Sequence, residues 1–308
     1  MPHMIPAFEF RRRAREAMLR VLSVLVLATL IAMLPSLASN TITLMSGSDP
    51  LAAMTDLYTE ERLTAMMDED AAVAQAAMDE INAGMVVFFQ QKWPFIALTL
   101  AITLIFGPVL TLGLNHTLLK TLRREEISVS TVLERLPLFL KAIGLNLMTA
   151  LRTMLWSLPG TALMLLGAAV MIFVPALGLL CTLAGTVVMV VLMIRAMYRY
   201  RLATYVMADA PETGINAALR RSAQVMKGRK IELFSLEFSF MGWRLLVSMA
   251  QMMFIAMLGP VVGMTLGLFT SFFLQMYVYM AEAAFYQEYA VGPLPQNGDE
   301  PADEDELI

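Results

Sequence analysis

The sequence predicts an all-α membrane protein, a polytopic bundle of about six transmembrane helices with cytoplasmic interfacial helices. Two observations lead to this fold class. The 308-residue chain is 58% hydrophobic and only 16% charged, whereas soluble domains are roughly 45–50% apolar and 25% charged. Apolar runs that could cross about 30 Å of hydrocarbon as helices also recur along the chain. We therefore expect much of the apolar surface to face lipid.

Six runs reach the length of about 20 predominantly apolar residues that a membrane span requires. They lie at 18–38, 93–119, 142–172, 176–198, 231–258 and 261–287. The first run has a second interpretation, because arginines, an apolar core and then Ser36-Leu37-Ala38 are also the pattern of a cleaved signal peptide. Cleavage would leave five spans.

Basic residues predict how the spans are oriented. They gather before the first span, between the second and third, and between the fourth and fifth, whereas Arg62 and Lys92 are the only Lys or Arg residues in 39–92. Short loops rich in Lys and Arg remain on the cytoplasmic side. We expect a multi-pass protein of the cell membrane with both termini in the cytoplasm. The net charge of −4 hides this segregation and gives no reason to expect a nucleic-acid partner.

Composition also predicts the structure of the segments that flank the spans. Residues 48–84 are rich in Ala, Glu, Met and Leu, with a helix start signal at Asp49-Pro50 and a helix stop signal at Gly84. This composition predicts an external acidic helical segment. Residues 292–308 combine three prolines with six carboxylates, which predicts a disordered acidic cytoplasmic tail. We expect residues 1–291 to form a single membrane domain.

Two short amphipathic helices are expected at the cytoplasmic interface, over 132–141 and 215–230. Each follows residues that can cap a helix, Ser130-Thr131 and Thr213, and its apolar and basic residues fall on different faces. Each then leads into a span with an internal arginine and a returning helix. This order predicts two related units, at about 127–198 and 213–288.

Charged residues inside the spans form the first candidate site. Arg152 and Arg244 lie about 15 and 20 Å from the cytoplasmic ends of their spans, where a charge costs roughly 2.5–3.5 kcal/mol. Glu237 and Glu282, each about 9 Å deep, are expected to be level and to offset that cost. With Arg195 these residues form an expected intramembrane polar cluster. It is either a polar pathway or, as we prefer, a set of ion pairs that orients helices.

Basic residues of the 215–230 helix form the second candidate site. They are Arg220, Arg221, Lys227, Arg229 and Lys230. Each basic group near an anionic leaflet can contribute on the order of 1 kcal/mol to membrane binding, so we expect contact with anionic lipid headgroups. The alternative is that these charges only orient the spans.

Other polar residues carry weaker signals. His116, beside Asn115, is interpreted as part of a capped helix end and not as a proton relay. Two histidines, His3 and His116, and one cysteine, Cys181, cannot build a zinc site of the usual kind. Methionines of the external segment could bind Cu(I), but Met makes up 27 of the 308 residues, which favours a general packing role. We find no catalytic or nucleotide motif and expect neither a cofactor, nor a metal, nor an enzyme activity.

A series of short motifs follows the fourth span. It comprises Tyr205 with Ala208-Asp209-Ala210-Pro211, AALRRSAQVMKGRK at 217–230, Leu233-Phe234-x-Leu236, Ser239-Phe240-Met241-Gly242-Trp243 and Phe285-Tyr286. In order and spacing the series resembles the bacterial multi-pass family catalogued as domain of unknown function 975, mainly over residues 120–288. Three departures are the absence of an Ile-Pro-Gly at the tyrosine-rich end of the fourth span, Met276-Tyr277 in place of a Pro-Tyr, and the external acidic segment, which we interpret as an addition to the family pattern. The resemblance implies an integral membrane protein without an established activity.

These observations favour a non-enzymatic scaffold or an envelope-associated factor. The expected partners are the lipid bilayer with its anionic lipids, and other membrane proteins. The alternative is a small-solute transporter or channel that uses the buried Arg/Glu cluster. A water-accessible path through that cluster would favour transport, and a dry cluster would favour the scaffold.

Overall fold

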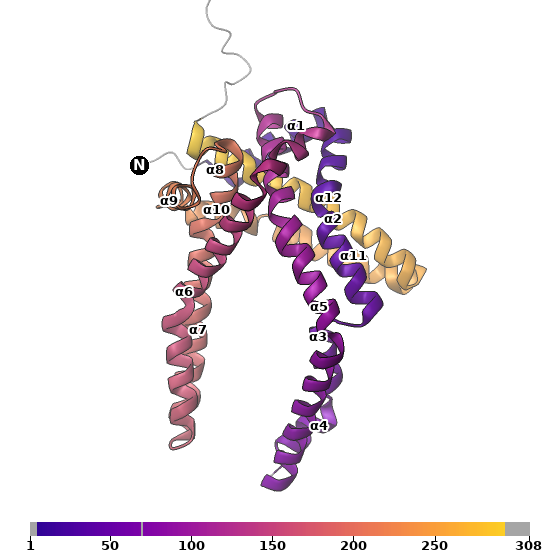
Figure 1. Cartoon of the computed structure of the whole chain (residues 1–308), viewed down its shortest axis with the longest axis vertical. Helices are drawn as coiled ribbons and strands as arrows, with labels where there is room; N and C mark the ends of the chain where they lie inside the picture. Colours follow the sequence, from indigo (N-terminus) through magenta and orange to yellow (C-terminus); the bar gives the residue numbers. More distant parts are fainter. Residues whose placement is uncertain (1–4, 69, 293–308) are drawn as a thin grey trace, which may run out of the picture. The chain divides into compact units, whose positions relative to one another are not determined.

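The computed structural model describes residues 5–68 and 70–292, and all regular elements in these ranges are helices (Figure 1). The predicted all-α class is therefore confirmed. Contacts between residues group the chain into two compact units, Met1–Ile31 with Val109–Ile308, and Ala32–Pro108. The predicted acidic tail, from 293 onward, and His3 lie outside the described residues.

Five helical stretches of the described chain are long and apolar enough to cross a membrane. They are Leu22–Leu57, Ala72–Leu122, Val129–Met171, Pro175–Asp209 and Lys230–Leu258. Each contains most or all of one predicted run. The run at 261–287 coincides with α12 (Pro260–Tyr286), and the count of six spans stays a prediction.

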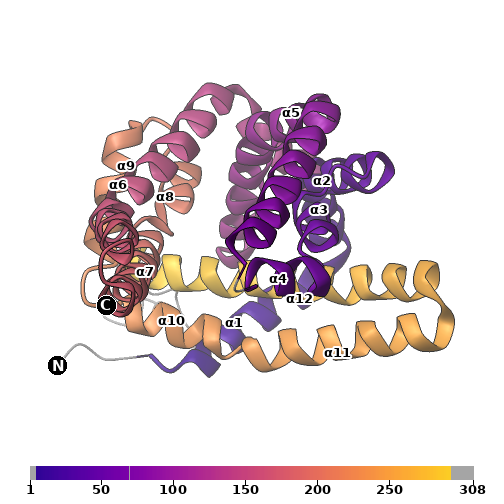
Figure 2. The same ribbon diagram turned by 90° about the horizontal axis from the view of Figure 1, so that it is seen from below.

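Two helical hairpins dominate the larger unit. Helix α6 (Phe139–Met171) packs along α7 (Pro175–Tyr200), and α11 (Met241–Leu258) packs along α12 (Figure 2). Glycines let α6 and α7 approach closely, because a Cβ on any of the four would overlap the backbone of the other helix. They are Gly160, Gly167, Gly178 and Gly185. Small residues serve this purpose at helix interfaces in membranes.

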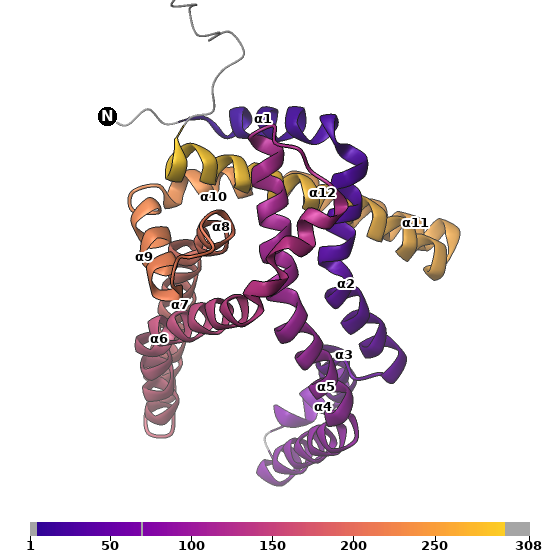
Figure 3. The same cartoon turned by 45° about the horizontal axis from the view of Figure 1, so that its top comes forward.

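The core of the larger unit lies where short helices meet the ends of the long ones. In helix α8 (Ala203–Asp209), Ala203 and residues 205–208 are buried. The last part of α12 is buried from Met280 to Tyr286. Helix α1 (Ala7–Arg20) lies alongside α12, where the rings of Phe10 and Phe285 have centroids 5.4 Å apart (Figure 3). A π-helical turn, η2 (Gln287–Val291), follows α12.

The fifth predicted run lies within one stretch that is long and apolar enough to span a membrane, Lys230–Leu258, but the helix is interrupted there. The chain forms α10 (Lys230–Phe238) and α11, separated by Ser239 and Phe240. The Phe240 side chain is fully buried and its amide donates to the Glu237 carbonyl at 3.0 Å, while the Ser239 hydroxyl donates to the Leu236 carbonyl at 2.6 Å. Burial of Phe240 therefore fixes a bend that apolar length alone does not reveal.

The two predicted amphipathic segments are helical with shifted bounds. The first is a 3₁₀ helix, η1 (Val129–Leu138), which Ser128 and Thr131 cap reciprocally one turn earlier than expected. The second is α9 (Ile215–Val225), whose N-cap is Gly214 and not Thr213. It ends early because Gly228 has a positive φ of 84° that closes the turn into α10. Their place at a membrane interface stays a prediction.

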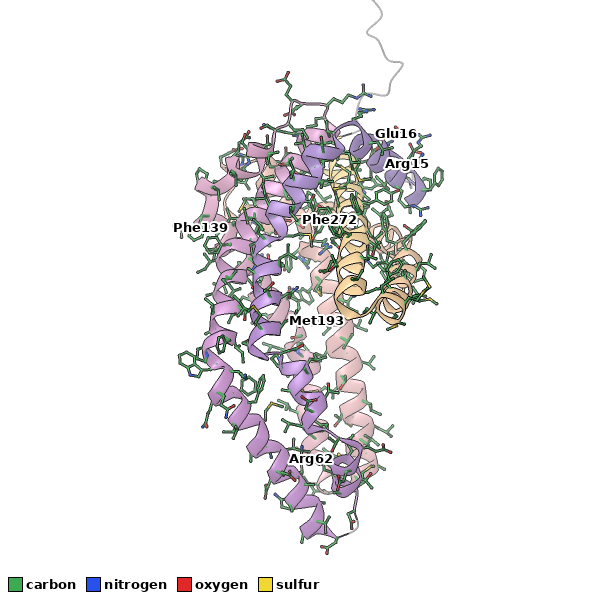
Figure 4. The ribbon with its side chains drawn as sticks, turned by 90° about the vertical axis from the view of Figure 1, so that its right-hand side faces the viewer. Arg15, Glu16, Arg62, Phe139, Met193 and Phe272 are labelled. Carbon is green, nitrogen blue, oxygen red and sulfur yellow. The ribbon has the colours of Figure 1, made fainter. Side chains whose placement is uncertain are left out.

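The smaller unit contains the end of α2 (Leu22–Ser46), α3 (Pro50–Leu57), α4 (Glu60–Met66) and the start of α5 (Ala71–Leu122). Asp49 caps α3 by accepting the Leu51 amide at 2.9 Å, as its sequence position predicts. Arg62 of α4, labelled in Figure 4, forms an ion pair with Glu80 of α5.

The helical character predicted for 48–84 is confirmed, but the predicted helix end at Gly84 was wrong. Helix α5 runs through Gly84, because the residues on both sides favour helix and one internal glycine costs only about 1 kcal/mol. Gly84 serves packing instead, since a Cβ there would overlap the Leu57 side chain of α3.

Candidate functional site

Glu282 is the most deeply buried charged side chain of the candidate cluster. It lies on the last part of α12, where Ala281, Ala283 and Ala284 leave room for close neighbours, and its side chain is 2% exposed. A buried carboxylate without a partner would cost several kcal/mol. Its partner therefore decides what this part of the protein can do.

Arg201 is that partner. It occupies the corner between α7, which ends at Tyr200, and α8, which begins at Ala203. Its Nη2 donates to Glu282 Oε1 at 2.7 Å, and its Nε lies 3.5 Å from Glu237 Oε1. The planar guanidinium suits this arrangement, because it offers several donors in fixed directions. One arginine thus joins the α7–α8 corner to α10 and α12.

A tyrosine completes the cluster. The Tyr198 hydroxyl donates to the second carboxylate oxygen of Glu237, so both oxygens of that side chain are engaged. We name Tyr198, Arg201, Glu237 and Glu282 the Arg201 cluster. Its groups satisfy one another, which is the arrangement of a network that fixes helix positions.

A second set of contacts holds α8 in place beside this cluster. The ring of Tyr205 stacks on Tyr286 with centroids 5.8 Å apart, and the Tyr286 hydroxyl donates to Asp209 Oδ2 at 3.2 Å. Asp209 Oδ1 accepts from Arg123 Nη1 at 2.7 Å, and Arg123 Nε donates to Gln287 Oε1 at 2.9 Å. Tyr205, Asp209 and Tyr286, all members of the motif series, therefore connect the end of α5 to α8 and α12.

The other residues of the predicted polar cluster make no hydrogen bond or ion pair with the Arg201 cluster among the described residues. Arg152 donates to Asn216 Oδ1 at 2.9 Å, and its guanidinium lies 5.9 Å from the ring centroid of Tyr200. The Arg195 carbonyl accepts from Lys230. Neither Arg152 nor Arg244 forms a direct ion pair with a carboxylate among the described residues. Arg244 is exposed, but it lies close enough to Glu282 to attract its carboxylate. Glu237 and Glu282 are brought together, but by Arg201, which lies between the fourth and fifth predicted spans.

Arg201 was missed because it lies just beyond the predicted end of the fourth span at residue 198. A signal for it was available. Two carboxylates at the same expected depth need a nearby cation. Arg199 and Arg201 are the first two basic residues after the predicted end of the span, so both were candidates for that cation.

The predicted lipid-contact residues have different surroundings. Arg221 Nη2 donates to the Ala290 carbonyl at 3.0 Å, and the Arg229 guanidinium lies 4.3 Å from the ring centroid of Tyr289. Arg220 and Lys227 are exposed. Lys230 Nζ donates to the Arg195 carbonyl at 3.3 Å.

His116 connects α5 to η1. Its Nδ1 faces Arg135 Nη2 at 3.0 Å and its Nε2 faces Glu134 Oε2 at 3.2 Å. A guanidinium can only donate, so Nδ1 accepts and Nε2 carries the proton that is donated to Glu134. Within the described chain, no group of three or more His, Cys, Asp or Glu side chains is arranged to hold a metal ion.

Comparison with known families assigns the chain. The family model described as protein of unknown function (DUF975) matches residues 8–290. The chain belongs to this family. The match confirms the resemblance and reaches well beyond residues 120–288, so it also spans the acidic segment 48–84. Neither the curated proteins nor the solved structures gave a match to this DUF975 protein.

Proposed function

We propose that this DUF975 protein is a multi-pass protein of the bacterial cell membrane, with six spans and both termini in the cytoplasm, and that it acts as a non-enzymatic scaffold or envelope-associated factor. The observation that carries the proposal is the state of Glu282. Its side chain is 2% exposed and its carboxylate is bound by Arg201 at 2.7 Å. A carboxylate held in this way orients helices and offers no oxygen-lined path to a solute.

The rest of the Arg201 cluster supports the same interpretation. Transport pathways depend on intramembrane charges that water or the solute can reach. Here Glu237 is held by Arg201 and Tyr198, and together with Glu282 it joins the α7–α8 corner, α10 and α12. The cluster fits a rigid connection between helices better than a route for solutes.

The exposed sides of the hairpins offer the surface that a scaffold needs. Leu166 of α6, Leu180 and Met193 of α7, and Met252 of α11 are all exposed (Figure 4 labels Met193). In a bilayer such side chains contact lipid or the spans of another membrane protein. We assign a second membrane protein as the partner of these hairpins.

A cysteine-accessibility experiment separates the scaffold from the transporter. In a Cys181→Ser background, a cysteine replaces Ala281, which is fully buried beside Glu282. In folded protein purified in a mild detergent, a charged thiol reagent should not label this position, whereas the exposed control Lys227→Cys should label rapidly. Labelling of Ala281→Cys at the control's rate would support a water-filled path and would overturn the scaffold proposal.

A crosslinking experiment tests the partner. A photoreactive amino acid at Leu166 or Leu180 should form one defined adduct with a membrane protein in cells, and the same group at the buried Leu145 should form none. Solute flux through proteoliposomes that contain the purified protein, without any adduct from the exposed positions, would favour the transporter.

A further inference from the structure

A cleft of about 750 Å³ lies between the end of α7 and the turn that joins α9 to α10. Its lining comprises Arg195, Arg199, Ala223, Lys227, Gly228, Lys230 and Ile231. Four of these seven residues are cationic and none is acidic. We name this feature the cationic cleft.

The charges of the cationic cleft are not neutralised by protein carboxylates. None of its four basic side chains forms an ion pair within the part of the chain that the structure describes. The acidic residues of α10 do not line the cleft, since Glu237 belongs to the Arg201 cluster and Glu232 is absent from the cleft lining. Arg195 and Arg199 also lie close enough to Lys230 to repel its ammonium group. Gathering like charges is unfavourable unless an anion is bound among them.

Several of these groups are held in position without a ligand. The Arg199 guanidinium lies 5.6 Å from the ring centroid of Trp156, and its Nε is buried without a hydrogen-bond partner. Lys230 Nζ is held by the Arg195 carbonyl at 3.3 Å. These contacts hold the two cations in place before a ligand binds, so that binding costs less side-chain entropy.

The backbone adds to the positive field. Helix α10 begins at Lys230, and both Lys230 and Ile231 line the cleft. The first backbone N–H groups of a helix have no acceptor within it, and this end carries a partial positive charge. Helix N-termini of this kind are suited to bind phosphate.

We propose that the cationic cleft binds a phosphate group, either as the headgroup of an anionic lipid or as a free phosphate. A phosphate offers several strong acceptor oxygens to guanidinium and ammonium donors. The volume exceeds that of the phosphate alone and leaves room for the group that carries it. None of the four cations belongs to the Arg201 cluster, so the site stands independently of the scaffold proposal.

Binding of a fluorescent short-chain phosphatidic acid to the full-length protein in neutral detergent tests this site. The double variant Arg199→Gln with Lys230→Gln removes two charges from the cleft. The matched control, Arg15→Gln with Arg20→Gln, removes two exposed charges from α1, outside the cleft lining. The cleft variant should bind about tenfold to thirtyfold more weakly and the control less than about twofold more weakly, because each removed cation weakens binding separately.

Competition then identifies the source of the phosphate. Displacement of the probe by inorganic phosphate assigns a free phosphate, whereas displacement only by unlabelled phosphatidic acid, and not by phosphatidylcholine, assigns a lipid headgroup. If the double variant does not fold, Lys227→Glu, at an exposed position, serves in its place and should also weaken binding. Equal losses in the cleft and control variants would show diffuse surface attraction and overturn the proposal, as would unchanged binding in the cleft variant.

Discussion

Replacing Arg201 tests the network that holds the larger unit together. Arg201→Gln removes the charge that binds Glu282 at 2.7 Å while keeping a side chain that can donate hydrogen bonds. At that separation and an effective dielectric constant of about 20, Coulomb's law gives an attraction of about 6 kcal/mol. Desolvation of the pair offsets part of this attraction. Measured losses on removing one partner of a fully buried pair are about 3–5 kcal/mol. Because 40% of the Arg201 side chain is exposed, this range is an upper limit for the expected loss in the free energy of unfolding.

The double variant Arg201→Gln with Glu282→Gln provides the decisive comparison. With both charges removed, no carboxylate remains buried alone, so most of the lost stability should return. Unfolding by a denaturing detergent, followed by circular dichroism, measures all three proteins, and Arg220→Gln serves as the exposed control. A loss in Arg201→Gln no larger than that of the control would refute our assignment of Arg201 as the partner of Glu282.

Three further predictions concern packing, topology and the exposed arginine. Gly167→Ala should destabilise the α6–α7 hairpin by about 1–3 kcal/mol through overlap with the backbone of α7, whereas Gly242→Ala, with nothing near its Cβ, should be neutral in the same unfolding assay. In a cysteine-free background, a cysteine near Arg62 should label from outside intact cells and one near Lys227 should not, and external labelling at Lys227 would contradict the positive-inside orientation. Arg244→Ala should change the free energy of unfolding by no more than about 0.5 kcal/mol, because the side chain is exposed and forms no direct ion pair among the described residues. A loss of several kcal/mol would show that Arg244 forms a strong ion pair when the protein is in a membrane.

The sequence predicts the long helices well because apolar length is a local property. Each of the five apolar stretches can be read from consecutive residues, and Asp49 marks the start of α3 in the same way. The bend at Ser239-Phe240 is different. It depends on the burial of Phe240 against Tyr277 of α12. The centroids of the two rings lie 5.1 Å apart and the ring planes form an angle of 89°. A local sequence pattern does not indicate a contact with a distant helix. The predicted helix end at Gly84 was wrong for the same reason, because the glycine allows a close contact with Leu57 that the local sequence does not indicate.

The sequence predicts a cluster of charged residues but does not identify the arginine that belongs to it. Depth within the spans selects Glu237 and Glu282 as side chains that need a partner. It assigns that role to arginines inside the spans, whereas Arg201 reaches both carboxylates from a helix corner. The cationic cleft is hidden for a similar reason, because Arg195 and Arg199 lie more than 25 residues before Lys227 and Lys230 in the sequence.

The glycine contacts of α6 and α7 bear on how the chain enters a bilayer. Gly160 and Gly167 stand seven residues apart on α6, as do Gly178 and Gly185 on α7, so the contact faces stay aligned over two helical turns. The connecting residues, Ile172 to Val174, carry no charge and expose apolar side chains. No charged group of this turn has to cross the hydrocarbon. In the topology that we propose, the two helices can therefore associate early and enter the bilayer as one hairpin, so that their pairing does not depend on the order in which the other spans are placed.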